Sequence, residues 1–318
     1  MNSYKLHGIL NGINMDAFNP ETDSKIFKKY GPNNPQDKQV NKTELLKLCG
    51  LEGDANTPVI GIVTRFVDQK GLDLIEAVLP DILADDVRLI VLGTGDYRYE
   101  QMFIEAKRRW PDKVSASIMF SGDLANRIYA GADMFLMPSK FEPCGLAQMI
   151  ALRYGTIPIV RETGGLKDTV HAFVDYAGTG NGFTFASYNA HDMLHTVRRA
   201  VHYYQNNREV WYRLIVRGMT GDYSWYSSAG KYMALYEDVT RPATSFTLTE
   251  ETPENPKTAP ASQAEVGDVK EAAKEAPKAE EKPKAKRGRK KAEPKVEAVA
   301  EVAEVKEEAK EAPKAEEK

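Results

Sequence analysis

A regular alternation of strand-like and helix-like segments runs from residue 58 to residue 239 and limits the possible folds more than any other feature. Short runs rich in β-branched residues are followed by segments with apolar residues at helical spacing. This alternation predicts an α/β fold, a doubly wound, Rossmann-like parallel sheet, because parallel strands need crossover helices. The expected strands are 58–66, 87–92, 114–120, 134–138, 156–160 and 181–185. The expected helices are 71–83, 97–110, 124–130, 146–154, 166–173, 190–204, 209–217 and 224–239, with a shorter helical patch near 42–48.

The composition changes after Phe246, the last aromatic residue of the chain. Residues 247–318 are mostly Ala, Glu, Lys, Pro and Val, which bury too little apolar surface to offset the entropy of ordering. We therefore expect a disordered tail. The tail repeats one decapeptide at 273–282 and 309–318, with a basic cluster at 284–291 between the copies. A solvated tail is the simpler interpretation of that cluster, and a nucleic-acid-binding patch is the minor alternative.

Several features limit the compartment and the class of protein. The two cysteines, Cys49 and Cys144, are too few for a disulfide framework or a metal site and indicate a reducing compartment. No apolar run approaches the length of a membrane span, and the first residues lack the apolar region of a signal peptide. The net charge of -3 does not favour a polyanion partner. We expect a cytoplasmic protein with no membrane or nucleic-acid partner and no metal.

The strand-to-helix turn at residues 139–148, Ser-Lys-Phe-Glu-Pro-Cys-Gly-Leu-Ala-Gln, is the strongest indication of function. In open α/β sheets, ligands bind at the carboxyl ends of the strands, where this turn begins. Glu142 supplies a carboxylate, and the amides of Gly145, Leu146 and Ala147 at the start of the following helix attract anions. A carboxylate beside an anion site suits a hydroxylated group joined to a phosphate. The turn therefore predicts a site for a sugar nucleotide.

Two cations follow the first expected strand. Arg65 and Lys70 lie on the loop at its carboxyl end, where a guanidinium fork and a mobile ammonium suit a diphosphate leaving group. Taken alone, the two cations are more simply interpreted as solvated surface groups, but the turn at 139–148 on the same sheet favours phosphate binding. Phe120 ends another strand, where its ring would stack on a nucleobase or pack in the core. Cys144 has no histidine nearby in sequence, so we expect a packed side chain rather than a nucleophile.

These motifs resemble those of the bacterial glycogen synthase and plant starch synthase family. The similar segments are Asn11-Gly-Ile-Asn, Phe18-Asn-Pro-Glu-Thr-Asp, residues 65–73, residues 130–146, Tyr154-Gly-Thr, Thr163-Gly-Gly-Leu and Asp222-Tyr-Ser-Trp. They cover about residues 1–240, and the segment at 141–146 is highly specific for the family. Ile150 stands where related glycosyltransferases outside the family carry a second glutamate. The resemblance implies a retaining α-1,4-glucosyltransferase that moves glucose from ADP-glucose to the nonreducing end of a glucan.

The resemblance also implies roles for single residues. Arg65 and Lys70 match the pair that holds the diphosphate, and Glu142 matches an active-site glutamate that positions the donor near the transferred glucose. Phe120 stands where the family places an aromatic ring against adenine, and Asn11 matches an asparagine of the interdomain segment. The remaining donor-binding residues implied are Cys144, Gly145, Leu146 and Ala147. The resemblance implies no cofactor and no metal.

The family resemblance further implies the domain organisation. Synthases of this family are GT-B glycosyltransferases with two Rossmann-like domains and an active site between them. Residues 1–20 resemble the interdomain segment, residues 21–246 the C-terminal, donor-binding domain, and residues 247–318 no part of a synthase. We therefore expect the C-terminal half of a synthase, which is inactive alone and whose partner would be a separate N-terminal half. The alternative is a non-catalytic nucleotide-binding, glucan-binding or scaffold protein derived from a synthase.

Overall fold

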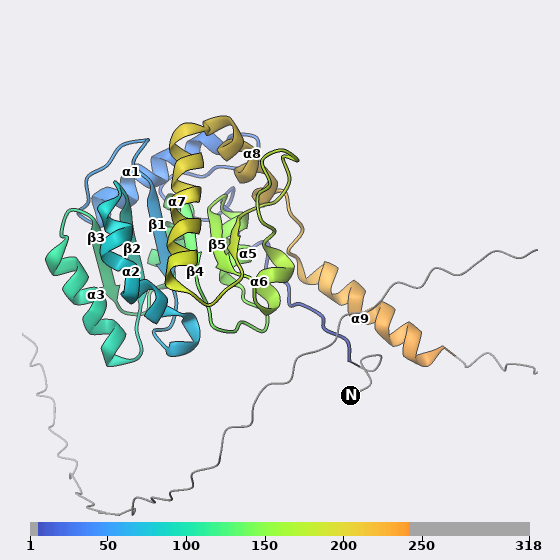
Figure 1. Ribbon diagram of the computed structural model, residues 1–318. Coiled ribbons are helices and arrows are strands. Elements are labelled where there is room, and N and C mark those ends of the chain that lie inside the picture. Colours follow the sequence, from blue (N-terminus) through green and yellow to red (C-terminus); the bar gives the residue numbers. More distant parts are fainter. Residues whose placement is uncertain (1–5, 242–318) are drawn as a thin grey trace, which may run out of the picture. The chain divides into compact units, whose positions relative to one another are not determined.

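The computed structural model describes residues 6–241, which form a six-stranded sheet (Figure 1). The strands are β1 (Val59–Val63), β2 (Arg88–Gly93), β3 (Val114–Ile118), β4 (Met134–Met137), β5 (Ile157–Arg161) and β6 (Phe183–Phe185). They lie in the order β3-β2-β1-β4-β5-β6, and each neighbouring pair is parallel. The predicted doubly wound parallel sheet is confirmed.

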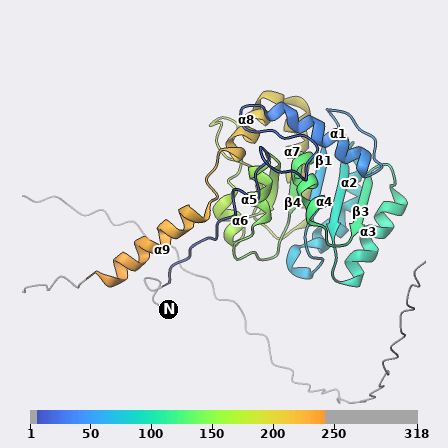
Figure 2. The ribbon, with the colours of Figure 1, turned by 180° about the vertical axis from the view of Figure 1, so that it is seen from behind.

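Helices cover both faces of the sheet. They are α1 (Lys38–Leu48), α2 (Leu72–Ala84), α3 (Tyr97–Arg109), α4 (Gly122–Gly131), α5 (Ala147–Arg153), α6 (Gly164–Thr169), α7 (Ala190–Asn206), α8 (Arg208–Met219) and α9 (Trp225–Thr240), with short 3-10 turns η2 (Pro35–Asp37) and η3 (Asp68–Lys70). Helices α2 and α7 pack together over one face, and α1 and α4 over the other (Figures 1 and 2). Because both faces are covered, the central strands β1 and β4 are apolar along their length, and every residue of β4 is buried.

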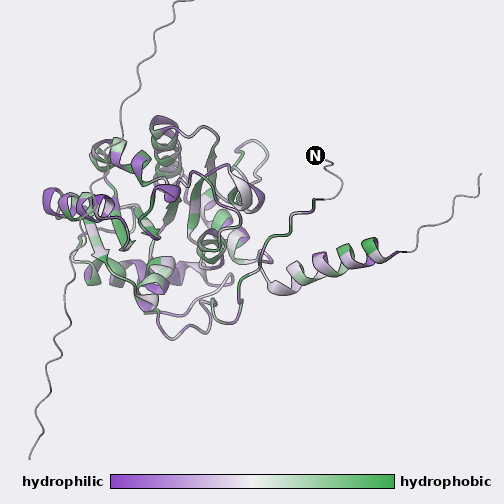
Figure 3. Cartoon of the chain, turned by 90° about the horizontal axis from the view of Figure 1, so that it is seen from below, coloured by the Kyte–Doolittle hydropathy of each residue, from purple (hydrophilic) through white to green (hydrophobic). Residues whose placement is uncertain are grey.

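The hydrophobic core lies between the sheet and its two helical layers. Figure 3 shows apolar residues along the inner strands and polar residues on the outer surfaces of the helices. The aromatic side chains of Phe103, Phe135 and Phe183 are fully buried there. Helix α9 contributes least, because Ser228 is its one buried residue.

The strand order reverses between β1 and β4. The chain leaves β1 toward β2 and β3 and then crosses back to place β4 on the other side of β1. The register pairs Ile60 with Met134 and Gly61 with Phe135. At such a reversal, the connections after the two strands run to opposite faces of the sheet and leave a crevice at the carboxyl ends. The loops after β1 and β4 therefore border the same crevice.

The predicted and observed elements agree in type and differ at their ends. The strand predicted at 58–66 ends at Val63, and Phe66 instead forms an isolated bridge with Gly95. The predicted tail, with its repeat and its basic cluster, lies outside the described residues. Within residues 6–241, no helix has the length and hydropathy needed to cross a membrane.

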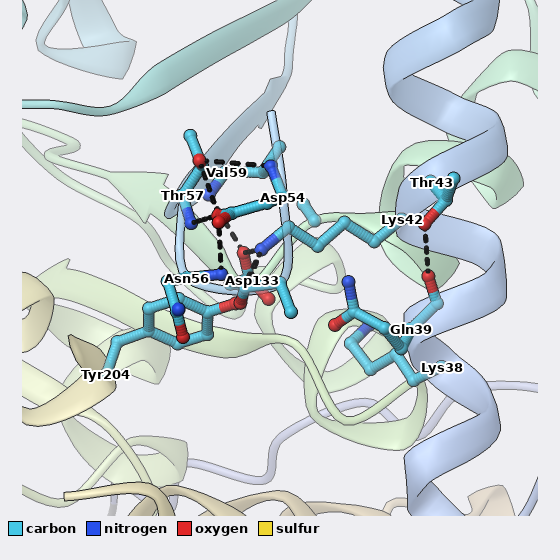
Figure 4. A network of polar contacts seen from close by, with 12 residues as sticks. Lys38, Gln39, Lys42, Thr43, Asp54, Asn56, Thr57, Val59, Asp133 and Tyr204 are labelled. Carbon is cyan, nitrogen blue, oxygen red and sulfur yellow. Dashed lines mark hydrogen bonds and ion pairs between the residues drawn. The ribbon is translucent and has the colours of Figure 1, made fainter. Parts of the chain in front are cut away.

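A buried polar network lies at the amino ends of β1 and β4, the end of the sheet away from the crevice (Figure 4). The Lys42 ammonium from α1 lies 2.9 Å from the Asp133 carboxylate, and the two side chains are 1% and 9% exposed. The same carboxylate oxygen accepts a 2.9 Å hydrogen bond from the amide of Val59, the first residue of β1. Lys42 also donates to the hydroxyl of Tyr204 on α7. The network therefore joins two helices to the start of the sheet.

Lys38, one turn before Lys42 on α1, is buried beside this network. Its ammonium donates hydrogen bonds of 2.8 Å to the carbonyl of Ala130 and 2.7 Å to the hydroxyl of Thr156. The pKa of Lys38 is lowered to about 7, chiefly by burial; the charge of Asp133 opposes this shift, and the charge of Lys42 adds to it. Lys38 is therefore a titratable group inside the fold near neutral pH.

Candidate functional site

The predicted cation Lys70 and the predicted carboxylate Glu142 meet in the crevice between β1 and β4. The Lys70 ammonium lies 2.6 Å from Glu142 Oε2, and the Ser139 hydroxyl donates a 3.2 Å hydrogen bond to the same oxygen. The charged side chains are 16% and 9% exposed, so little water surrounds the ion pair. Electrostatic interactions are stronger there than at an open surface. A ligand in the crevice would therefore meet a positive and a negative group that are already in contact.

The two loops that carry this pair are bound to each other. The Gln69 side chain donates a 3.1 Å hydrogen bond to the carbonyl of Phe141, and the amide of Lys140 donates a 2.8 Å bond to the carbonyl of Gln69. Gly71 has a φ of +71°, and a side chain there would lie 2.1 Å from the carbonyl oxygen of Pro138. Only glycine permits both this conformation and this close approach. The loop contacts therefore hold Lys70 at a defined place beside Glu142.

The glycine turn after β4 is held against the start of α6. The amide of Gly165 donates a 3.0 Å hydrogen bond to the carbonyl of Glu142. A side chain at Gly164 or Gly165 would lie 2.2 Å from the carbonyl oxygen of Glu142 or 2.0 Å from that of Cys144. The Thr163-Gly-Gly-Leu motif therefore supports the turn through its backbone.

Three consecutive amides of this turn are unused. In the described part of the chain, the amides of Gly145, Leu146 and Ala147 donate no hydrogen bond, so they are available to an anionic ligand. The Leu146 side chain is 45% exposed. Cys144 is a half-buried free thiol that packs against the hydrophobic core. Its position agrees with a packing role.

A cavity of about 230 Å³ lies at the carboxyl ends of β1, β2 and β3. Its lining is mainly apolar and includes Val63, Leu92, Gly93, Met119 and Ala125. Arg65 and Phe120 also line this cavity. The Phe120 ring is 91% exposed, which excludes the alternative of a core phenylalanine and leaves its face free for stacking. Such a cavity suits a flat, apolar group such as a nucleobase.

The cavity adjoins the position of Lys70. A small depression of about 10 Å³ is lined by Lys70 and Ser139, and Thr64 lines both this depression and the larger cavity. Arg65 is exposed, and within residues 6–241 its guanidinium makes no hydrogen bond or ion pair, although its carbonyl accepts a 3.1 Å bond from the amide of Val67. The structure therefore brings Arg65, Phe120, Lys70 and the turn after β4 to one edge of the sheet.

Asn11 lies elsewhere. It lines a cavity of about 390 Å³ together with Asp168, His171 and Arg217, and none of the other predicted site residues lines that cavity. The segment of Asn11 runs beside the start of α9, where the amide of Ile13 donates a 2.8 Å bond to the carbonyl of Tyr223. In this structure Asn11 is therefore not a neighbour of the Lys70–Glu142 pair.

Reasoning from the sequence missed residues that support the site. Ser139 hydrogen-bonds Glu142, Gln69 joins the two loops, and Gln148 contacts the backbone of the glycine turn. The sequence contains one indication for Gln148, because this polar residue directly precedes the apolar run 149–152. The structure shows that its side chain is fully buried. No cluster of three or more His, Cys, Asp or Glu side chains within residues 6–241 is arranged to hold a metal ion.

The comparisons with known proteins agree with this geometry. The family model described as glycosyl transferases group 1 matches residues 51–213, which include β1 to β6 and the whole crevice. The chain belongs to the group 1 glycosyltransferases. Within this family it is similar to the glycogen synthase of Clostridium novyi, with 52% identity over 237 residues, 74% of this chain and 49% of that protein. The glycogen synthase of Desulforamulus reducens is 54% identical over 233 residues, which cover 73% and 48% of the two chains.

Solved glycosyltransferase structures show the same fold. The catalytic domain of starch synthase IV from Arabidopsis thaliana, bound to ADP and acarbose, has 37% identity and a TM-score of 0.70 over 74% of this chain and 49% of that one. Sucrose-phosphate synthase from Thermosynechococcus elongatus, at 19% identity, a TM-score of 0.50 and 73% and 52% coverage, shows likeness of fold alone. The predicted membership of the glycogen and starch synthase family and the predicted GT-B fold class are confirmed. The chain spans about half the length of these relatives.

Proposed function

We propose that this protein provides the donor-binding domain of an ADP-glucose-dependent glycogen or starch synthase. The observation that carries the proposal is that a nucleobase-sized cavity beside Phe120, two cations and the Glu142 carboxylate lie along the carboxyl edge of one sheet. The identity to glycogen synthases and the likeness to a starch synthase bound to ADP support the same donor. The product is an α-1,4-glucan extended at its nonreducing end.

In this proposal, each group of the crevice contacts one part of the donor. Adenine stacks on Phe120, and Arg65 and Lys70 neutralise the diphosphate as it leaves. The amides of Gly145 and Leu146 bind phosphate or glucose oxygens. Glu142 accepts hydrogen bonds from hydroxyls of the transferred glucose. Asn11, implied by the family resemblance alone, has no donor contact assigned to it by this geometry.

The proposed transfer retains the configuration at the glucose C1 atom. The bond between C1 and the phosphate oxygen breaks, and a bond from C1 to the 4-hydroxyl oxygen of the glucan forms on the same face. The hydroxyl proton passes to the departing ADP. We propose that no metal or cofactor takes part, since Arg65 and Lys70 already supply two positive charges beside the diphosphate.

The chain spans about half the length of its relatives, so we also propose that synthesis needs a further synthase domain, in this protein or on a separate chain. Calorimetry with the 318-residue chain should detect ADP binding, and Arg65→Ala should weaken it by about tenfold, the loss of one charge-assisted phosphate contact. With ADP-glucose and glycogen, the chain alone should not lengthen the glucan. Failure to bind millimolar ADP would refute the proposal and favour a scaffold protein, whereas glucan elongation would refute the need for a further domain.

A further inference from the structure

The side chain of Gln148 is fully buried directly behind the glycine turn. Its Nε2 atom lies 3.1 Å from the carbonyl oxygen of Cys144 and 3.0 Å from that of Gly145. It also lies 3.1 Å from the hydroxyl of Thr169, which in turn donates a 2.6 Å bond to the carbonyl of Gly165. One carboxamide therefore contacts two successive peptide groups of the turn and joins them to α6.

The contacts to two carbonyls fix the direction of two amides. A trans peptide group is planar, and its C=O and N–H bonds point in opposite directions. The carbonyl of Cys144 shares a peptide group with the amide of Gly145, and the carbonyl of Gly145 shares one with the amide of Leu146. Because both carbonyls face Gln148, both N–H bonds point to the opposite side of the turn. Neither amide has a partner among the described residues.

The orientation of the Gln148 carboxamide follows from its acceptors. Only an NH2 group can donate to two carbonyl oxygens, so the amide nitrogen must face the turn. The Oε1 atom is then left buried without a hydrogen-bond partner. Gly145, with a φ of +69°, makes room for this arrangement, because a side chain there would lie 2.5 Å from Oε1. The turn and Gln148 are thus fitted to each other at the cost of one unpaired acceptor.

We propose that Gln148 is a positioning residue for donor binding, which aims the amides of Gly145 and Leu146 at the phosphate groups of ADP. The inference rests on the proposed function, since it takes ADP as the ligand of this crevice. Gln148 itself lies behind the turn and would not contact the ligand. It acts through the turn, as the Thr163-Gly-Gly-Leu motif does, and both approach the carbonyl of Cys144.

Calorimetric titration of the 318-residue chain with ADP tests this role. Gln148→Met keeps the approximate shape of the side chain but removes the NH2 group that donates to the two carbonyls. The amides of Gly145 and Leu146 should then lose their alignment with the phosphates, and ADP affinity should fall by about tenfold or more. Adenosine, which lacks the phosphates, should bind the Phe120 cavity with unchanged affinity. A residue needed only for general folding would weaken both ligands. Gln101→Glu, on the exposed surface of α3, is the matched control and should bind ADP as the wild type does.

Gln148→Glu provides a second measurement that does not depend on the stability of the methionine variant. An ionised carboxylate is acceptor-only and would face two carbonyl oxygens, whereas a protonated carboxyl donates one hydrogen bond. Burial raises the pKa of such a carboxyl group, so it should become protonated as the pH is lowered. The ADP affinity of Gln148→Glu, relative to that of wild type, should therefore be low at pH 8 and recover as the pH falls to about 5.5. If wild type binds ADP and both variants bind it with the same affinity as wild type, the role of Gln148 is refuted, while the proposed function stands. Absence of ADP binding by wild type would overturn the proposed function as well.

Discussion

Removing the negative charge of Glu142 should strengthen the binding of ADP. The Lys70 ammonium is paired with Glu142 at 2.6 Å, so an incoming phosphate competes with a carboxylate for the same cation. A phosphate oxygen at hydrogen-bond distance from Lys70 would lie about 5 Å from that carboxylate. At an effective dielectric constant of about 20, the repulsion of two unit charges at this distance is about 3 kcal/mol.

Glu142→Gln should remove most of this repulsion while it preserves the shape of the side chain. Water and the remaining exposure of Lys70 reduce the effect, so we expect ADP to bind about tenfold more tightly, equivalent to about 1.4 kcal/mol. The gain should be smaller for ADP-glucose, because the carboxamide accepts hydrogen bonds from glucose hydroxyls less strongly than the carboxylate does.

Isothermal calorimetry at two salt concentrations measures the effect directly. The matched control is Glu105→Gln, which removes a carboxylate of an exposed ion pair on α3 and should leave ADP affinity unchanged. The difference between wild type and Glu142→Gln should shrink only slightly with salt, since the pair is largely shielded from water. Equal or weaker ADP binding by Glu142→Gln would refute the idea that the ion pair competes with the phosphate.

Three further changes separate binding from stability. Phe120→Ala should weaken ADP binding by about tenfold through lost stacking, with an unchanged melting temperature because the ring is 91% exposed; a lower melting temperature would contradict this. Lys42→Met leaves Asp133 buried without its cation, so urea denaturation should show a loss of at least about 3 kcal/mol in the free energy of unfolding, with ADP affinity retained; a loss below 1 kcal/mol would contradict it. Lys38 has a pKa of about 7 in the folded state, whereas an exposed lysine has its ordinary pKa of 10.5, so the unfolded chain binds more protons between these values. The free energy of unfolding should therefore rise with pH in this range, by up to about 1.4 kcal/mol per pH unit. The wild-type free energy of unfolding should therefore rise relative to that of Lys38→Met from pH 7 to pH 10, and parallel curves would refute the assignment.

Much of this fold follows from local pattern, because buried parallel strands must be apolar and must be joined by helices. The ends of the strands follow less well. Phe66 continues the apolar run after β1, yet it leaves the ladder and pairs only with Gly95. Its backbone pairing depends on the neighbouring loop, while its ring is fully buried against Phe103, and the apolar run alone indicates neither contact.

The candidate site could be predicted in part for the same reason. Lys70 and Glu142 each follow an expected strand, so both belong at the carboxyl edge of the sheet. Their direct contact depends on β1 and β4 being neighbours, and strand order is a property of the whole chain that the alternation does not specify. Asn11 is placed by its packing along the segment before α9, more than 200 residues away in sequence, which no local pattern indicates.

The neighbouring positions of β1 and β4 also affect when the crevice exists during folding. Lys70 and Glu142 are separated by 72 residues, and β2, α3, β3 and α4 lie between them in the chain. Such distant pairing is entropically expensive until the intervening elements are in place, so we expect the crevice to form late in folding. ADP would then bind only molecules whose sheet is complete and would stabilise them by mass action. An ADP-affinity resin should therefore retain the folded protein and release chains in which β4 has not joined β1.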